Sequence, residues 1–347
     1  MTLDKPHSDL PEDVLFGTSA ETKRIKSWVL RAASADVPVL LLGESGTGKE
    51  VMARVLHTYS QRSSQPLTKV NCPAIPGTLL ESEIFGYERG AFTGAYESKA
   101  GLVEAAENGT LFLDEIAEMD PSLQAKLLQL LQDGTYVRIG GQEEKRANVR
   151  IICATNRRLS DEVQRGAFRR DLFYRINVIT VEMPPLRQRR EDIPTLVAHF
   201  LKLQQEQYGT VERTISPCLM RLFLQYDWPG NIRQLENLIK RYVILESEES
   251  VAASLLGDDR LIRTDGGTSL KTLTKSATRE LERKIILSVL YHNNWNRKRA
   301  AEVLSISYRT LFYKLKDAGV PQKRRRRSQP ALPADTCPAG VEESQNS

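Results

Sequence analysis

An apolar run followed at once by a glycine-rich turn is the feature that most constrains the fold of this chain. Val39–Leu42 reads as a buried strand, and Gly43-Glu-Ser-Gly-Thr-Gly-Lys49 follows it ahead of a helix-like stretch. In such a strand–loop–helix arrangement, glycines let backbone N–H groups turn toward phosphate oxygens, and the helix N-terminus adds a favourable dipole. The last position of the motif, where Ser or Thr usually binds Mg²⁺, is Glu50 here, so other groups must contribute more to metal binding. The residues expected to contact the nucleotide are Gly43, Glu44, Ser45, Gly46, Thr47, Gly48, Lys49 and Glu50.

A second apolar run ends in two adjacent carboxylates, in Gly109-Thr-Leu-Phe-Leu-Asp-Glu115. Asp114 at the strand tip can hold Mg²⁺ directly or through water. Glu115 can polarise the water that attacks the γ-phosphate. Acidic residues after a strand also serve as helix caps or lie in solvated turns. Together with the upstream loop, however, the pair predicts ATP hydrolysis with ATP and Mg²⁺ as cofactors.

Strand-like and helix-like segments alternate through the first half of the chain. The strand-like runs are 39–42, 68–71, 110–113, 149–154 and 177–181. This alternation predicts an α/β fold, a mainly parallel sheet with flanking helices. After Pro184-Pro185 the pattern is helical, over 193–208, 217–226 and 231–246. The expected organisation is a tail (1–13), an α/β subdomain (14–182), a helical subdomain (183–246), a linker (247–275), a C-terminal helical domain (276–320) and a basic, disordered tail (321–347).

Composition is that of a soluble globular protein, with 40% hydrophobic and 27% charged residues among 347. No apolar run approaches the roughly 20 residues of a membrane span, and the N-terminus has no signal-peptide pattern. We therefore expect a cytoplasmic protein. The cysteines are far apart and form no CxxC, which argues against a disulfide framework or a structural zinc site. They are Cys72, Cys153, Cys218 and Cys337.

Charge is distributed unevenly along the chain. Residues 271–327 contain 16 Lys and Arg against 4 Asp and Glu, a surplus of 12, so the remainder carries −7 within the net charge of +5. This pattern indicates nucleic-acid binding confined to the C-terminal end. There, two short helices (298–304 and 308–316) flank Ser305-Ile-Ser307 and predict a helix–turn–helix, whose second helix would enter the major groove. A preceding helix (276–291) is the expected dimer interface.

The predicted DNA contacts divide into phosphate contacts before the turn and base contacts on the second helix. The basic run 323–327 would add non-specific, salt-sensitive affinity. A basic helical hairpin used for protein contacts is the alternative. The predicted DNA-binding residues are Arg297, Lys298, Arg299, Ser307, Tyr308, Arg309, Thr310, Tyr313, Lys314 and Lys316.

A hexapeptide between the two nucleotide motifs carries a family resemblance. It reads Gly90-Ala-Phe-Thr-Gly-Ala95, and here the chain resembles the sigma-54-dependent transcriptional activators, also called bacterial enhancer-binding proteins, a branch of the AAA+ ATPases. In that family the hexapeptide tips a loop that touches the sigma-54 subunit of RNA polymerase. From the residues alone, an ordinary glycine-rich surface loop would be the simpler interpretation. The resemblance implies a polymerase contact for Gly90, Ala91, Phe92, Thr93, Gly94 and Ala95.

The resemblance also implies roles for residues outside the two nucleotide motifs. Asn71 matches an asparagine thought to sense the γ-phosphate and contact the catalytic glutamate, and Asn156 resembles sensor I. Arg169 and Arg175 resemble arginine fingers that reach a neighbouring subunit's nucleotide, with surface salt bridges as the alternative. Arg233 resembles sensor II. Glu50 is what many of these activators carry at its position. The C-terminal pattern resembles the Fis-like domain of the family, although Ser305 stands where glycine is common.

By resemblance, the function is ATP-dependent activation of transcription from upstream DNA. The expected assembly runs from a dimer to a hexameric ring, of one kind of subunit or of mixed subunits. Sigma-54 RNA polymerase and double-stranded DNA are the expected partners, and no membrane is expected. Only about 13 residues precede the ATPase, so no receiver is expected and control would act in trans. The alternatives are an AAA+ remodeller of another protein and a DNA-binding repressor with a vestigial ATPase.

Overall fold

The computed structural model describes residues 14, 16–210, 213–256 and 282–317. These residues divide into two compact units. The first unit contains the described residues up to His199 together with Trp228–Asn237, and the second contains Phe200–Asp227 and the described residues from Leu238 onward.

Five parallel strands form the sheet of the first unit, in the order β2-β5-β8-β1-β9. The strands are β1 (Val39–Leu42), β2 (Leu67–Asn71), β5 (Thr110–Asp114), β8 (Arg150–Thr155) and β9 (Ile179–Glu182). Their carboxyl ends meet at one edge, where Leu42 is in register with Thr155 and Asn71 with Asp114. The parallel α/β sheet predicted from the alternating pattern is therefore confirmed, with each strand within two residues of its expected start.

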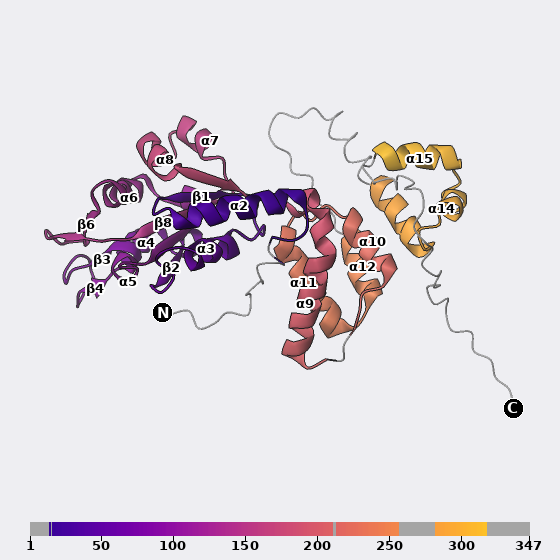
Figure 1. Cartoon of the computed structure of the whole chain (residues 1–347), viewed down its shortest axis with the longest axis horizontal. Helices are drawn as coiled ribbons and strands as arrows, with labels where there is room; N and C mark the ends of the chain where they lie inside the picture. The colour runs from indigo at the N-terminus through magenta and orange to yellow at the C-terminus, as the bar shows by residue number, and fades with distance from the viewer. Residues whose placement is uncertain (1–13, 15, 211–212, 257–281, 318–347) are drawn as a thin grey trace. The chain divides into compact units, whose positions relative to one another are not determined.

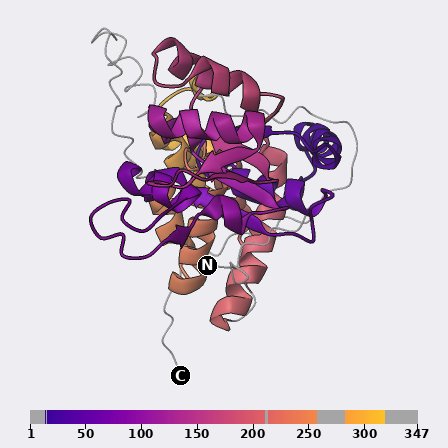
Figure 2. The same ribbon diagram turned by 90° about the vertical axis from the view of Figure 1, so that its left-hand side faces the viewer.

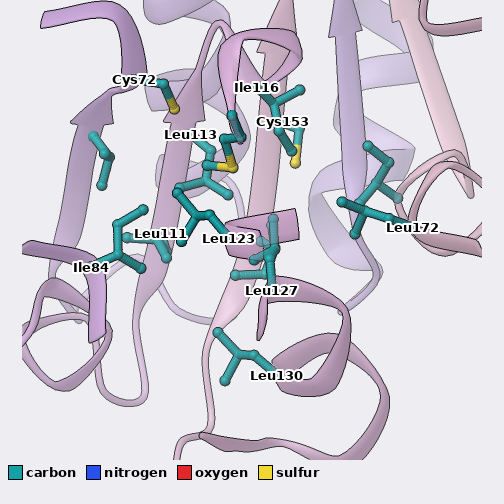
Figure 3. Close-up of a cluster of buried hydrophobic side chains, with 14 of the residues drawn as sticks. Cys72, Ile84, Leu111, Leu113, Ile116, Leu123, Leu127, Leu130, Cys153 and Leu172 are labelled. Carbon is teal, nitrogen blue, oxygen red and sulfur yellow. The ribbon is translucent and has the colours of Figure 1, made fainter. Parts of the chain in front are cut away.

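Both faces of the sheet are apolar and covered by helices (Figures 1 and 2). On one face Leu40 packs in a cluster with Leu127, and Figure 3 shows part of this cluster around Leu111, Leu113 and Leu123. On the other face Leu41 packs in a cluster with Met52 and Leu56. Because neighbouring strand residues point to opposite faces, the continuous apolar run Val39–Leu42 supplies both cores.

The helices of the first unit begin and end where local chemistry favours it. Ser19 caps the first one, its hydroxyl accepting from the Thr22 N–H at 3.3 Å. Another helix starts with Pro121 and ends at Gly134 with φ of 68°. The helices are α2 (Ala20–Ser34), α3 (Lys49–Thr58), α4 (Gly77–Phe85), α5 (Leu102–Ala105), α6 (Pro121–Asp133), α7 (Leu159–Gln164) and α8 (Arg170–Ile176), with the 3₁₀ turns η1 (Cys72–Ala74), η2 (Ile116–Glu118), η3 (Leu186–Gln188) and η4 (Arg190–Asp192).

Two small antiparallel ribbons were not predicted from the sequence. One pairs β3 (Gly86–Tyr87) with β4 (Lys99–Ala100), and the other pairs β6 (Thr135–Val137) with β7 (Glu144–Arg146). Strands of two or three residues are too short for an alternating pattern to be visible. The hexapeptide Gly90–Ala95 lies between β3 and β4, so the pairing of these two strands holds the two ends of its loop together.

The helical segment after the sheet contains α9 (Ile193–Tyr208), α10 (Pro217–Gln225), α11 (Asn231–Leu245) and α12 (Glu248–Leu256). The first three match the predicted helices. The fourth occupies the beginning of the predicted linker, and that prediction is wrong for these residues because Val251, Ala252 and Leu255 are buried. The rest of the predicted linker, 257–275, lies outside the described residues.

The C-terminal part is a small three-helix core within the second unit. Residues 282–292 are helical, followed by α14 (Arg297–Val303) and α15 (Tyr308–Asp317). The residues Leu290, Ala300, Ala301, Leu311 and Leu315 are buried together. Ser305 adopts φ of 53° in the turn, so it takes the left-handed conformation for which glycine is common. The predicted tails (1–13 and 321–347) and the start of the expected dimer helix lie outside the described residues.

No helix among the described residues is long and apolar enough to cross a membrane. Cys72, Cys153 and Cys218 are buried free thiols, and Cys337 lies outside the described part of the chain.

Candidate functional site

The glycine-rich loop connects β1 to α3 at the carboxyl edge of the sheet. Gly46 has φ of 78°, and a Cβ there would lie 2.3 Å from the carbonyl oxygen of Gly230. The carbonyl of Gly46 also accepts from the N–H of Ile232 at 2.9 Å. Only glycine satisfies both the backbone angle and the close approach. Gly48, with φ of 98°, then starts α3, so the helix N-terminus lies directly behind the loop.

Lys49 is buried and folded back over its own loop. Its Nζ donates to the carbonyls of Gly43 at 2.8 Å and Glu44 at 3.3 Å. Nζ also lies 3.4 Å from Oε1 of Glu115. A lysine held at the centre of the loop in this way can exchange those carbonyls for phosphate oxygens. The predicted pairing of loop and lysine therefore exists in the structure.

The two predicted carboxylates emerge at the end of β5, facing the loop. Glu115 adopts φ of 55° and ψ of 53°, a left-handed conformation that is costly for a residue with a side chain and that concentrates at functional sites. Its Oε2 accepts from the N–H of Asn156 at 2.9 Å. The predicted contact of Glu115 with the Asn71 side chain is not formed among the described residues. Asn71 instead ends β2 beside Asp114.

Asp114 is suited to a metal ion that is shared with phosphate. Burial raises the pKa of Asp114, whereas the charge of Lys69 lowers it. Among the described residues, no group of three or more His, Cys, Asp or Glu side chains could hold a metal ion by itself. Mg²⁺ does not need such a group, because one or two carboxylates, phosphate oxygens and water complete its octahedron. Asp114 therefore fits Mg²⁺ bound together with nucleotide.

Glu50, at the usual Ser/Thr position of the loop motif, is engaged by cations. Lys69 donates to its Oε2 at 2.7 Å and Arg54 to its Oε1 at 3.1 Å. Burial raises the pKa of Glu50, but the hydrogen bonds and charges of Lys69 and Arg54 outweigh it, and the net pKa lies below its usual value. The carboxylate is thus ionised and already neutralised. Lys69 was not singled out from the sequence.

Replacing Lys69 with methionine should tighten divalent-metal binding to the ADP-loaded protein about three- to tenfold, because the carboxylates of Asp114 and Glu50 lose a competing cation. Electron paramagnetic resonance titration of Mn²⁺ measures the affinity directly. Lys99→Met is the matched control, since Lys99 pairs with Glu83 on an exposed surface. Unchanged or weaker Mn²⁺ binding in Lys69→Met would contradict the idea that Lys69 competes with the metal ion for Asp114 and Glu50.

The predicted sensor II segment contacts the loop within the first unit. Arg233 donates to Oγ of Ser45 at 3.1 Å. The amide of Asn231, which sequence reasoning missed, donates to the carbonyl of Ser45 at 3.0 Å and accepts from the N–H of Leu186 at 2.8 Å. Asn231 has φ of 52° and is completely buried. These contacts connect the start of α11 to the glycine-rich loop.

Glu44 and the guanidinium of Arg187 form a second anchor for the loop. Nη1 of Arg187 donates to Oε2 of Glu44 at 2.8 Å. This hydrogen bond holds the pKa of Glu44 below its usual value. Behind the loop, the buried Arg189 donates to the carbonyl of Thr47 at 2.8 Å. Neither arginine was predicted from the sequence, because each one meets the loop only in the folded chain.

The two predicted finger arginines lie at α8, away from the loop of their own chain. Arg169 is the N-cap residue, and its guanidinium donates to Asp171 at 2.7 and 3.1 Å. Arg175 in the last turn donates through Nε and Nη2 to the carbonyl of Leu131 on α6, at 3.1 and 2.9 Å. The structure does not bring either guanidinium to Asp114 or Glu115 of the same chain, and a role on a neighbouring subunit stays a prediction.

The hexapeptide forms an exposed loop between β3 and β4. The N–H of Gly90 donates to the carbonyl of Ala95 at 2.9 Å, closing the loop on itself. Phe92 remains 42% exposed although its ring stacks edgewise on Tyr87 at 4.9 Å. A Cβ on Gly90 or Gly94 would meet open space, so these glycines serve the backbone conformation. An exposed aromatic side chain held on such a loop is available to a partner.

The β6–β7 ribbon supports the hexapeptide loop from its side. Arg138 binds both carboxylate oxygens of Glu104, at 2.8 and 2.7 Å, and donates to Glu88 at 3.0 Å. The carbonyl of Ile139 accepts from the N–H of Glu88 at 2.9 Å. Sequence reasoning missed this ionic cluster, since its members are 34 and 50 residues from Arg138.

The C-terminal helices present a basic surface. Ser307 caps α15 by accepting from the N–H of Thr310 at 3.0 Å, and Arg309 stacks over the ring of Tyr313 at 5.8 Å. Arg309, Tyr313 and the other predicted reading residues are exposed, apart from Lys314. Lys314 pairs with Glu282 at 2.7 Å, so in this structure it lies on the side of the neighbouring helix. The exposed members of the predicted set are Lys298, Arg299, Ser307, Tyr308, Arg309, Thr310, Tyr313 and Lys316.

Three family models match the chain in succession. Residues 15–182 match the Sigma-54 interaction domain, 187–272 the AAA+ ATPase lid domain, and 277–317 the Fis family of bacterial regulatory proteins. The transcriptional regulatory protein ZraR of Salmonella typhimurium is 42% identical over 313 residues, covering 89% of this chain and 70% of that protein. The chain belongs to the sigma-54-dependent activators.

Other relatives of this activator agree. The regulatory protein AtoC of Escherichia coli is 45% identical over 296 residues, covering 84% of this chain and 64% of AtoC. Crystal structures of NtrX from Brucella abortus in complex with ADP and with ATP have a TM-score of 0.68 and 34% and 33% identity. They cover 88% of this chain and 69% of NtrX. The predicted AAA+ α/β fold with a lid and a Fis-type helix–turn–helix is thus confirmed.

Proposed function

We propose that this activator is a Mg²⁺-dependent ATPase that binds upstream DNA and remodels the closed complex of sigma-54 RNA polymerase so that the promoter opens. The observation that carries the proposal is the convergence in one unit of Lys49, Asp114 and Glu115 at the sheet edge, with the exposed hexapeptide on a ribbon of the same unit. Within a sigma-54 activator, this combination favours nucleotide chemistry coupled to a protein contact.

ATP hydrolysis is supported by the arrangement of groups at the loop. Lys49 and the N-terminus of α3 supply positive potential for phosphate. Asp114 would hold Mg²⁺, and the ion would neutralise charge on the phosphate oxygens. Glu115, fixed by Lys49 and the N–H of Asn156, would polarise the attacking water. The NtrX structures, solved with ADP and ATP, support nucleotide as the ligand.

Assembly into a ring is supported by the place of the arginines. Arg175 lies on α8 and Arg169 is its N-cap residue. Among the described residues, their guanidinium groups bind Asp171 and the carbonyl of Leu131, and not the nucleotide loop. In a head-to-tail ring, such arginines would face the nucleotide of the next subunit and stabilise charge on the transferred phosphoryl group. Asn71, Asn156 and Arg233 would then sense the γ-phosphate from within the subunit.

Contact with polymerase would be made by Gly90–Ala95. Thr93 and Phe92 are exposed on the loop, offering a hydroxyl and an apolar ring. The support from Arg138 and the β6–β7 ribbon would transmit movement to this loop during the ATP cycle. The Fis-type domain would hold the protein on two-fold related DNA sites, because dimeric readers bind such sites.

Transcription from a sigma-54 promoter with purified polymerase, ATP and this protein tests the proposal. Thr93→Ala is expected to lose at least about tenfold in open-complex formation while ATP turnover stays within about twofold, because a hot-spot contact carries roughly 2 kcal/mol and Thr93 is far in the chain from the nucleotide loop. Permanganate footprinting measures opening, and phosphate release measures turnover.

Ser98→Ala is the matched control, since it removes an exposed hydroxyl near the end of the same loop but outside the hexapeptide. If both variants open the promoter as well as wild type, Thr93 is not part of the contact. If wild type hydrolyses ATP but does not open the promoter, the protein remodels another target. If wild type itself fails to hydrolyse ATP, the protein is a DNA-binding regulator with a vestigial ATPase.

A further inference from the structure

Gln124 is a polar residue buried on the apolar face of α6. Its side chain is 0% exposed, and its neighbours Leu123 and Leu127 belong to the core under the sheet. The amide Nε2 donates to the carbonyl of Met119 at 2.8 Å and to that of Ala167 at 3.0 Å. Nothing in the nucleotide loop contacts this side chain. Both N–H groups of this amide are therefore paired, which offsets the cost of burying them.

The acceptor side of the same amide holds the start of α8. Oε1 of Gln124 accepts from the backbone N–H of Arg169 at 2.8 Å. Arg169 is the N-cap residue of α8, so its N–H has no partner within that helix. Gln124 therefore fixes the backbone from which the Arg169 side chain projects. Its hydrogen bond to the carbonyl of Ala167 fixes the segment just before α8.

The other end of α6 holds the second arginine. The carbonyl of Leu131, seven residues after Gln124, accepts from Nε and Nη2 of Arg175. Seven residues of α-helix rise about 10 Å, so α6 is attached to the arginine segment at two separate points. The helix follows the catalytic carboxylate closely, because only η2 and two residues separate Glu115 from Pro121.

We propose that Gln124 is a positioning residue that aligns the finger arginines with the nucleotide of the neighbouring subunit. The inference rests on the proposed function, in which Arg169 and Arg175 act in trans. Loss of Gln124 then damages the active site of the next subunit and spares that of its own.

Mixing of subunits distinguishes these two sites. Gln124→Met removes all three hydrogen bonds at nearly constant size, and alone it should lose about a hundredfold in ATP turnover, the order expected for a misplaced catalytic group. Binding of fluorescent ADP should stay within about twofold. In an equal mixture with Glu115→Gln, turnover should recover to about a quarter of wild type, since one neighbour pair in four joins an intact Glu115 to intact fingers.

Two controls make each outcome decisive. Arg175→Ala mixed with Glu115→Gln must recover in the same way, and failure of this pair overturns the proposed trans arrangement itself. If that pair recovers and Gln124→Met does not, Gln124 acts on its own site and the positioning role is wrong. Gln132→Met makes the same change at an exposed site of α6 and should keep wild-type turnover.

A second variant covers the case in which Gln124→Met does not fold. Gln124→Asn keeps an amide in the core but is one methylene too short to reach the N–H of Arg169. Circular dichroism and ADP binding establish that it folds. Gln124→Asn is then mixed with Glu115→Gln as before. Recovery of ATP turnover supports positioning in trans. If turnover does not recover although the mixture with Arg175→Ala does, the positioning role of Gln124 is wrong.

Discussion

Glu115→Gln is expected to reduce ATP turnover at least about a hundredfold while ADP still binds. A general base or water-orienting carboxylate typically contributes 10²- to 10⁴-fold, and the amide cannot accept a proton. The backbone at Glu115 is left-handed and its carboxylate is held by Lys49 and the N–H of Asn156, so glutamine can occupy the same position. Because Lys49 loses a competing anion, ADP affinity should stay equal or rise.

Phosphate release under saturating ATP measures the turnover, and a fluorescent ADP titration measures binding. Glu118→Gln is the matched control, since Glu118 lies in the following 3₁₀ turn and pairs with Arg157 on the surface. That variant should retain turnover within about twofold, in keeping with the small worth of an exposed ion pair. Equal turnover in both variants would falsify the assignment of Glu115.

Arg175→Ala is expected to lose about 10³-fold or more in ATP turnover, in the range that arginine fingers contribute. In the structure its guanidinium is held by the carbonyl of Leu131, a neutral acceptor, and phosphate oxygens in the transition state would be stronger partners. Nucleotide affinity should change little, because the arginine does not contact the glycine-rich loop of its own chain.

The matched control for this arginine is Arg165→Ala. Arg165 is itself 72% exposed, and its partner Glu162, a buried carboxylate, keeps a second cation in Arg157 at 3.7 Å when Arg165 is removed. Turnover should be measured across protein concentrations, because a trans-acting finger contributes only in the assembled ring. If Arg175→Ala keeps wild-type turnover at every protein concentration, Arg175 is not an arginine finger.

Much of the nucleotide site could be predicted because its residues follow a local rule. The carboxyl ends of β1, β5 and β8 carry Gly43, Asp114 and Thr155, and parallel strands bring such ends to one edge. Each motif can therefore be identified from the residues of one strand and the turn that follows it. The helix–turn–helix was equally visible, since Ala300, Ala301 and Leu311 are spaced to meet, and they are buried together.

Residues that act through long-range contacts could not be predicted in this way. Arg138 meets Glu104 and Glu88 across the two ribbons, and Gln124 meets the N–H of Arg169 across 45 residues. Nothing near them in sequence marks these partners. Lys314 is a residue for which the local pattern predicted a DNA contact. In the folded chain its ammonium group instead pairs with Glu282 of the preceding helix.

The sequence by itself therefore determined the parallel sheet, the glycine-rich loop, the carboxylates at the strand end and the helix–turn–helix, because each depends on periodicity or on backbone needs within a few residues. Only the tertiary structure decided the left-handed backbone of Glu115, the neutralisation of Glu50 by Lys69 and the attachment of both arginines to α6. Those features depend on which side chains meet once the strands and helices have packed. Packing is set by the whole chain and is not visible in any one segment.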